Sequence, residues 1–296
     1  MTTVIDGNAV AADVREALTD AVETLTDAGH RPGLATVLMS DDPASETYVE
    51  MKQQDCEEIG IEPVHVDVDA NDSTAQLLDV IADLNDRGDV HGILVQTPLP
   101  DQVDAERAFR SIDPLKDVDG FHPENVGRLV RGDPRFRPCT PHGVQKLLDH
   151  VGVETEGADV TIVGRSNLVG KPLANLFLRR AEDGNATVTV CHSRTDDLAA
   201  KTRGADVVVT ACGVPELVTG DMLSPGVTVV DVGFNRVETD DGESEIVGDV
   251  EFESAKAQAD AITPVPGGVG PMTRAMLLWN AVKAAGLQTD TAVDLP

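Results

Sequence analysis

The chain is short of aromatic residues and of long apolar runs. Its 296 residues include one tyrosine, one tryptophan and six phenylalanines. No apolar stretch approaches the roughly 18 residues of a membrane-spanning helix, and no basic start followed by an apolar run opens the chain. We therefore expect a cytoplasmic protein with no membrane partner.

Cysteine is also scarce, and its placement excludes two common uses. The four cysteines are far apart in the sequence and form no C-x-x-C pair. Structural zinc sites and disulfide frameworks both require closely spaced or regularly paired cysteines, so neither is expected. These residues are Cys56, Cys139, Cys191 and Cys212.

Positive charge is the third deficiency. The chain has 52 acidic and 23 basic residues, a formal charge of −29, and only seven of the basic residues are lysines. Such a surface repels phosphate backbones, which excludes nucleic acid as a partner. Acid excess with few lysines is typical of halophilic proteins, because a Debye length of about 3 Å at 1 M salt screens the self-repulsion. An ordinary acidic surface is the alternative.

Short apolar runs alternate with helical segments along most of the chain, a pattern typical of parallel sheets covered by helices. Residues 113–141 interrupt it with a long connection rich in proline, glycine and aspartate, which indicates a functional loop or a domain link. We therefore predict two α/β domains joined near residue 140. The expected strands are 34–39, 63–68, 92–96, 158–164, 186–191, 205–212 and 227–233, and the expected helices are 10–25, 42–60, 73–86, 143–152, 171–181 and 273–286.

The segment "VTIVGRSNLVGKP", residues 160–172, has the pattern of a dinucleotide-binding turn. A strand leads into Gly164, a polar turn follows, and Gly170 precedes a helix start, where backbone N–H groups can receive a phosphate. Ser166 replaces the second glycine of G-x-G-x-x-G, so the pattern alone is weak and a simple tight turn is the alternative.

The end of the next strand favours NADP over NAD. NAD sites place an acidic residue there for the ribose 2′-hydroxyl, whereas NADP sites place a cation near the 2′-phosphate. Here the strand is followed by Ser193 and Arg194, and Arg165 lies in the first turn. A solvated loop charge remains the alternative for Arg194.

A second set of polar residues lies in the first domain. Tyr48, the only tyrosine, and Lys52 are four residues apart and so share one face of a helix. Gln96 ends a candidate parallel strand, where α/β sheets form binding sites, and Asp119 lies in the long loop. Asp117 and Asp119 are also compatible with turns or metal ligation, but no matching His or carboxylate cluster accompanies them, so no metal is expected.

These residues lie in blocks that resemble one known family. The segments "YVEMK", "GILVQTPLP", "PLKDVDGFHPENVGRL", "PCTPHGV", "VGRSNLVGKP", "TVCHSRT", "GDMLSPGVTVVDVGFNR" and "ITPVPGGVGPMTRAMLL" occur in the order found in bifunctional methylenetetrahydrofolate dehydrogenase and methenyltetrahydrofolate cyclohydrolase. The likeness extends from about residue 3 to residue 286. It implies NADP-dependent oxidation of 5,10-methylene-tetrahydrofolate and hydrolysis of the methenyl product to 10-formyl-tetrahydrofolate.

The resemblance also implies residue roles on the folate side. Lys52 would be the main catalytic residue, Gln96 would hydrogen-bond and tune it, and Tyr48 would stack on the folate. Asp119 would hold the pterin ring, and Gly270, in "PVPGGVGP", would let the backbone approach the ligand.

On the cofactor side, the resemblance implies phosphate and ribose contacts from the first turn, a 2′-phosphate contact and a nicotinamide contact. Two positions depart from the family pattern: Thr97 replaces a usual apolar residue, and Phe234 replaces a usual β-branched aliphatic residue, which puts cofactor affinity in doubt more than chemistry. The implied cofactor residues are Gly164, Arg165 and Ser166 for phosphates and ribose, Ser193 with Arg194 for the 2′-phosphate, and Phe234 for the nicotinamide.

The implied organisation is a folate-binding catalytic domain at 1–139 plus 272–296 and a Rossmann-like NADP-binding domain at 140–271, with the active-site cleft between them and a homodimer as the assembly. Two alternatives are a dehydrogenase without cyclohydrolase activity and a non-catalytic NADP-binding regulator. Retention of Tyr48, Lys52, Gln96 and Asp119 disfavours both.

Overall fold

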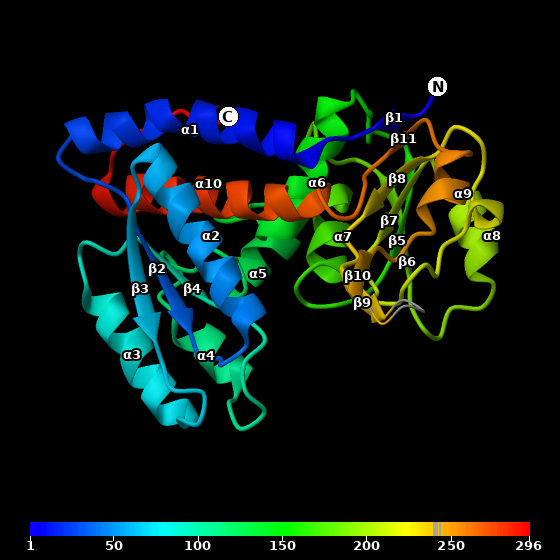
Figure 1. Ribbon diagram of the computed structural model, residues 1–296. Helices are drawn as coiled ribbons and strands as arrows, with labels where there is room; N and C mark the ends of the chain where they lie inside the picture. The colour runs from blue at the N-terminus through cyan, green and yellow to red at the C-terminus, as the bar shows by residue number, and fades with distance from the viewer. Residues whose placement is uncertain (239–241, 243) are drawn as a thin grey trace. The chain divides into compact units, whose positions relative to one another are not determined.

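The computed structural model describes residues 1–238, 242 and 244–296, and these divide into two compact units. The lysine unit comprises Ala12–Arg128, Pro134–Cys139 and Arg274–Pro296, and it contains Lys52. The glycine-loop unit comprises Met1–Ala11, Leu129–Asp133 and Thr140–Thr273, and it contains Gly164. Each unit is described by itself (Figure 1).

The lysine unit is built on a three-stranded parallel sheet in the order β3-β2-β4. Its strands are β2 (Gly33–Leu38), β3 (Glu62–Asp67) and β4 (Gly92–Val95). All residues of β2 and β4 are buried, as expected of strands covered on both faces. The strand β2 is central, with β3 on one side and β4 on the other. The chain therefore leaves the carboxyl end of β2 between these two strands, which is the usual position of an α/β binding site.

Helices cover this sheet. The helix α2 (Pro43–Ile59) packs against β2 and β3, and α3 (Thr74–Asp86) packs beside α4 (Ala105–Ser111). One core cluster joins Leu77 and Ile81 of α3 to Val37 and Ile93 of the strands. The remaining helices with residues in this unit are α1 (Gly7–Asp27), α5 (Pro123–Val130), α6 (Cys139–His150) and α10 (Val269–Thr289).

A buried lysine ends α3. Lys116 is 6% exposed, and its Nζ donates to the carbonyl oxygens of Leu84, Asn85 and Arg87 at 3.1, 2.7 and 2.7 Å. These carbonyls belong to the last turn of the helix and the residue that follows it, where a cation is favoured by the helix dipole. The same side chain thus connects α3 to the start of the loop that contains Asp119.

The glycine-loop unit contains a six-stranded parallel sheet in the order β1-β11-β8-β7-β5-β6. The chain order reverses at β5, whose neighbours are the next strand on one side and β7 on the other. This is the switch point at which doubly wound sheets bind nucleotides. The strands are β1 (Thr3–Val4), β5 (Asp159–Val163), β6 (Thr187–Cys191), β7 (Val207–Thr210), β8 (Thr228–Asp231) and β11 (Ala261–Ile262).

Short helices and one hairpin complete this unit. The helix α7 (Gly170–Leu178) packs against β5 and β6, and α8 (Leu198–Arg203) packs against β6. The hairpin pairs β9 (Asn235–Glu238) with β10 (Ser244–Val247) in antiparallel register. A 3-10 turn (Gly220–Met222) and α9 (Phe252–Lys256) lie beside each other.

The predicted α/β class is confirmed, and three details differ from the sequence expectations. The segment Met1–Ala11 groups with the glycine-loop unit rather than with residues 12–128, because Thr3 and Val4 pair with Ala261 and Ile262. The connection 113–141 contains α5, a helix of eight residues. The last helix begins at Val269 and runs past Gly286 to Thr289, so less of the C-terminus is irregular than predicted.

No helix among the described residues is long and apolar enough to cross a membrane.

Candidate active site

The helix α2 places Tyr48 and Lys52 one turn apart. It begins at Pro43 after the N-cap Asp42, whose carboxylate accepts from the backbone N–H groups of Ala44 and Ser45. Pro at the first turn and an acidic N-cap both favour a helix start at this point. Tyr48 is 40% exposed, whereas Lys52 is partly buried.

Gln96 contacts Lys52 directly. It follows β4, and its backbone N–H donates to Val37 at 2.9 Å, which keeps it at the carboxyl edge of the sheet. Its Nε2 donates to the Thr97 carbonyl at 2.6 Å, so the side-chain oxygen is turned the other way. Lys52 Nζ donates to that Oε1 at 2.6 Å. The amide therefore has one orientation, with its acceptor toward the lysine.

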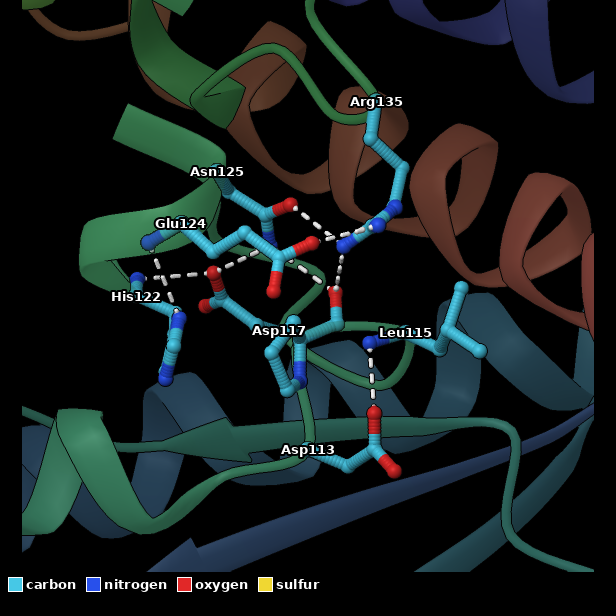
Figure 2. A network of polar contacts seen from close by, with 8 residues as sticks. Asp113, Leu115, Asp117, His122, Glu124, Asn125 and Arg135 are labelled. Atoms are coloured by element: carbon cyan, nitrogen blue, oxygen red, sulfur yellow. Dashed lines mark hydrogen bonds and ion pairs between the residues drawn. The ribbon is translucent and has the colours of Figure 1, made fainter. Parts of the chain in front are cut away.

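A polar network shapes the loop that contains Asp119 (Figure 2). Asp117 is 1% exposed, and its carboxylate accepts from the backbone N–H of His122 at 2.8 Å and from Asn125 Nδ2 at 2.8 Å. Arg135 donates to Asn125 Oδ1 at 3.1 Å and pairs with Glu124 at 2.6 Å. Asp117 is therefore a structural loop residue whose acceptors are used by the chain itself.

Asp119 lies two residues further along this loop. Val118, between the two aspartates, is fully buried, and its carbonyl accepts from Asn280 Nδ2 of α10 at 2.7 Å. The thiol of Cys139 lies 3.7 Å from Asp119 Oδ1. The loop backbone is thus held on both sides of Asp119, while its side chain is directed toward Cys139. Among the described residues, no group of three or more His, Cys, Asp or Glu side chains is arranged to hold a metal ion.

The electrostatics of this cluster suit proton transfer. Burial lowers the pKa of Lys52, partly opposed by the negative charge of Asp119. Burial raises the pKa of Asp119 to about 7, and the positive charge of Lys52 acts in the other direction. Burial also raises the pKa of Cys139 well above its ordinary value, so this thiol is uncharged at neutral pH. An amine whose pKa is lowered and a carboxyl whose pKa is raised, each influenced by the charge of the other, are perturbed groups of the kind found at proton-transfer sites.

In the glycine-loop unit, two positions of the turn after β5, Gly164 and Gly170, have no room for a side chain. Gly164 has φ +143°, and a Cβ on it would lie 2.2 Å from the Ala211 carbonyl oxygen. A Cβ on Gly170 would lie 2.2 Å from the Gly164 carbonyl oxygen. The two glycines therefore allow β5, the end of β7 and the start of α7 to approach closely. This brings the N-terminus of α7 to the switch point of the sheet, where a phosphate is favoured.

Two polar loops meet at this edge. The Gly164 N–H donates to the Cys191 carbonyl at 2.9 Å, which ties the first turn to the end of β6. Beyond Gly164 and Cys191, each loop has one exposed serine hydroxyl and one exposed arginine guanidinium. They are Arg165 and Ser166 after β5, and Ser193 and Arg194 after β6.

The two other predicted ligand residues lie elsewhere. Phe234 follows β8 and is 54% exposed, and Gly270 lies in the first turn of α10, where a Cβ would meet nothing within 4 Å. The predicted residues thus form two groups, with Tyr48, Lys52, Gln96 and Asp119 in the lysine unit and the other seven in the glycine-loop unit.

Three residues that surround Lys52 and Asp119 in the structure were not predicted as site residues from the sequence. They are Cys139, Asn280 and Arg274. Cys139 was noted only as an isolated cysteine, although it lies in the quoted block "PCTPHGV". Asn280 is a polar residue in the middle of an apolar helix and is completely buried, a pattern that indicates a specific hydrogen-bonding role. Arg274, whose guanidinium lies 3.2 Å from Asp55 of α2, gives no signal in the sequence, because this contact depends on the tertiary fold.

Family models account for most of the chain. The model described as "Tetrahydrofolate dehydrogenase/cyclohydrolase, catalytic domain" matches residues 5–119. The model described as "Tetrahydrofolate dehydrogenase/cyclohydrolase, NAD(P)-binding domain" matches residues 138–289. The first range includes Lys52 and its partners, and the second includes the glycine turn.

Full-length relatives agree with these matches. The chain is 69% identical to the bifunctional protein FolD of Natronomonas pharaonis and 66% identical to that of Halobacterium salinarum, each over 297 aligned positions covering all of both chains. Both relatives come from halophilic archaea.

Solved structures show the same fold. The bifunctional FolD enzyme of Campylobacter jejuni superposes with a TM-score of 0.91 at 46% identity, covering 97% of this chain and 99% of the other. The Trypanosoma brucei methylenetetrahydrofolate dehydrogenase-cyclohydrolase, solved with NADP and an inhibitor, gives a TM-score of 0.90 at 39% identity, covering 97% and 98%. With its two family models matched in order and its relatives aligned from end to end, this chain belongs to the tetrahydrofolate dehydrogenase/cyclohydrolase family.

Proposed function

We propose that the protein oxidises 5,10-methylene-tetrahydrofolate to the methenyl cation with NADP as acceptor and then hydrolyses this cation to 10-formyl-tetrahydrofolate. The observation that supports this most strongly is the 2.6 Å hydrogen bond from Lys52 to Gln96 beside Asp119 in the catalytic domain of the family. A dehydrogenase without hydrolytic activity would have no use for a lysine with a lowered pKa at this position. A non-catalytic NADP-binding regulator would need none of these groups.

The glycine-loop unit fits a dinucleotide. Its NAD(P)-binding domain has glycines where a Cβ would block the turn, and exposed arginine and serine side chains at the same sheet edge. We assign Gly164, Arg165 and Ser166 to the phosphates and ribose, and Ser193 and Arg194 to the 2′-phosphate. Two guanidiniums with no acidic residue directly after β6 favour NADP over NAD.

When bound, NADP supplies the hydride acceptor. The chain's own residues supply alignment: Tyr48 offers its exposed ring as a stacking plane for the folate, and Asp119 offers a carboxyl to the pterin ring. Phe234 and Gly270 would contribute mainly backbone near the nicotinamide and the folate. Holding the one-carbon bridge in line with the acceptor is sufficient protein catalysis for hydride transfer.

Hydrolysis requires more from the protein. Water attacks the methenyl carbon and loses one proton to a base. The bond from this carbon to N5 then breaks, N5 takes up a proton, and the added hydroxyl loses its proton to become the formyl oxygen, so one proton is released overall. In its uncharged form, Lys52 accepts the proton of the attacking water through Nζ, and Gln96 keeps the amine in place. A base with a pKa near the working pH is the most effective one for this transfer, which explains why burial of Lys52 matters.

A coupled assay tests the proposed function. Methylene-tetrahydrofolate and NADP are added to purified protein in high salt, and methenyl formation and decay are followed spectroscopically. We expect NADPH and methenyl to appear, followed by decay to the formyl product faster than the uncatalysed rate. Formation of methenyl without accelerated decay would leave a monofunctional dehydrogenase, and binding of NADP without turnover would leave a regulator.

We further propose that the enzyme is a cytoplasmic homodimer, as the family resemblance implies. Sedimentation of the purified protein in high salt would show twice the chain mass. A monomer mass would overturn this assignment without affecting the chemistry.

Salt dependence is expected from the charge of −29. Relatives from halophilic archaea support this reading of the composition. Repulsion between exposed carboxylates extends about 10 Å at 0.1 M salt but only about 3 Å at 1 M. We therefore expect activity and melting temperature to fall together when salt is lowered from molar to tenth-molar concentrations. Full activity and stability in dilute buffer would contradict the salt-adapted interpretation.

A further inference from the structure

An ion pair lies on the same face of α2 as Lys52. Asp55 follows Lys52 by three residues, so the two side chains are neighbours on the helix surface. Arg274 of α10 places Nη1 at 3.2 Å from Asp55 Oδ2. The Asp55 side chain is 8% exposed and that of Arg274 is 17% exposed. Both residues belong to the lysine unit, and neither is used in the proposed mechanism.

Stability alone does not explain this pair. Removing two charges from water is costly, and well-packed apolar residues at such positions are often at least as stable. Burial raises the pKa of Asp55, and the charge of Arg274 is the largest influence in the opposite direction. Arg274 therefore keeps a carboxylate charged at a place where burial disfavours charge. A buried pair of this kind therefore calls for a purpose besides stability.

The charges around Lys52 suggest what that purpose is. Its electrostatic neighbours are Asp119, which favours the charged amine, and Arg274, which favours the uncharged one. Cys139 is a neutral thiol at physiological pH because burial raises its pKa. Asp55 in turn faces Arg274, Arg15 and Glu58, and Arg15 lies 3.5 Å from Glu58. Because Arg274 contacts Asp55, one turn beyond Lys52 on α2, it brings a positive charge close to the amine.

We propose that Arg274, anchored by Asp55, is a positioning residue for the hydrolytic step: it presents a permanent positive charge to Lys52 and favours the uncharged amine that accepts the proton. This inference rests on the proposed function. It also answers a difficulty of the composition, because the nearby carboxylates of a chain with a charge of −29 favour the protonated form of a lysine wherever salt does not screen them. A guanidinium is suited to this role because it stays protonated at all relevant pH values.

Charge-changing variants at the two positions give opposite predictions. Arg274→Gln removes the cation, so the ascending limb of the cyclohydrolase pH profile moves up by about half a pH unit or more. Asp55→Asn leaves the cation without its counter-charge, so the limb moves to lower pH. Arg274→Lys keeps the charge and should restore most of the original profile. Arg15→Gln is the matched control, because this arginine faces Asp55 from α1, and it should leave the limb unchanged.

Competitive labelling of Lys52 provides a readout that does not depend on turnover. Each variant is treated with acetic anhydride across pH in molar salt, and the modified fraction of Lys52 is measured by mass spectrometry. The midpoint for Lys52 should rise in Arg274→Gln and not in Arg274→Lys. Lower activity in Arg274→Gln and Asp55→Asn with unchanged midpoints would overturn the proposal and leave a structural ion pair. If wild-type protein accelerates no hydrolysis, the proposed function fails, whereas the labelling still decides whether Arg274 acts on Lys52.

Discussion

Replacement of Lys52 by Met is expected to abolish cyclohydrolase activity, with a loss of about a thousandfold or more in the rate of methenyl hydrolysis. General base catalysis contributes roughly 10²–10⁴-fold, and Met fills a similar volume but has no group that accepts a proton. The fold and NADP binding should survive, because the lysine lies in a different unit from the glycine turn. The measurement is the decay of methenyl-tetrahydrofolate, compared with NADP affinity by titration.

The control is Lys201→Met. Lys201 is exposed on α8, away from the cluster. Its replacement by Met changes charge and volume in the same way as Lys52→Met. We expect its hydrolytic rate to match wild type. Continued formation of the 10-formyl product by Lys52→Met at a near-normal rate would show that Lys52 is not the base, and Gln96 and Asp119 would then have to be reconsidered.

The second large effect is expected at Lys116, on stability. Its Nζ serves three carbonyl oxygens at the end of α3, and Met in its place would leave these acceptors without that donor. Relief from burying a charge offsets part of the loss, since burial lowers the pKa of Lys116. We expect Lys116→Met to reduce the free energy of unfolding by about 2 to 4 kcal/mol. A fall of several degrees in melting temperature should accompany it.

Thermal unfolding followed by circular dichroism in molar salt measures this effect. Lys201→Met again serves as the control and should change stability by less than about 0.5 kcal/mol, as exposed substitutions usually do. Hydrolytic activity should also fall in Lys116→Met, because the lysine begins the loop that holds Asp119. A melting temperature within error of wild type would mean that water replaces the ammonium group at these carbonyls without cost.

Local pattern was sufficient for most of the fold. Apolar runs that alternate with helical periodicity predicted the strands β2, β3 and β4 and the helices α2 and α3 to within one or two residues. These elements are long or strongly patterned, so propensity and burial agree. The helix α5 was not predicted because glycine and proline dominate its surroundings, and the two-residue strands β1 and β11 are too short to show a period.

Local pattern was less informative about the site. The spacing of Tyr48 and Lys52 placed both on one face of a helix, and the strand end placed Gln96 at the edge of the sheet. That Gln96 turns its oxygen toward Lys52 depends on the Thr97 carbonyl, which accepts from the other end of the amide. That Asp117 is structural while Asp119 faces the cluster depends on the backbone N–H groups that the loop presents.

The sequence by itself determined the two α/β domains and predicted an NADP-type loop and the polar residues of the site, because these depend on periodicity and on residue types close together in the chain. The tertiary structure decided which distant residues meet. It brought Arg274 to Asp55 beside Lys52, and Asn280 to the loop before Asp119, across separations of more than 150 residues. Such pairs form because packing of α10 buries their polar groups, which must then find partners that no local pattern specifies.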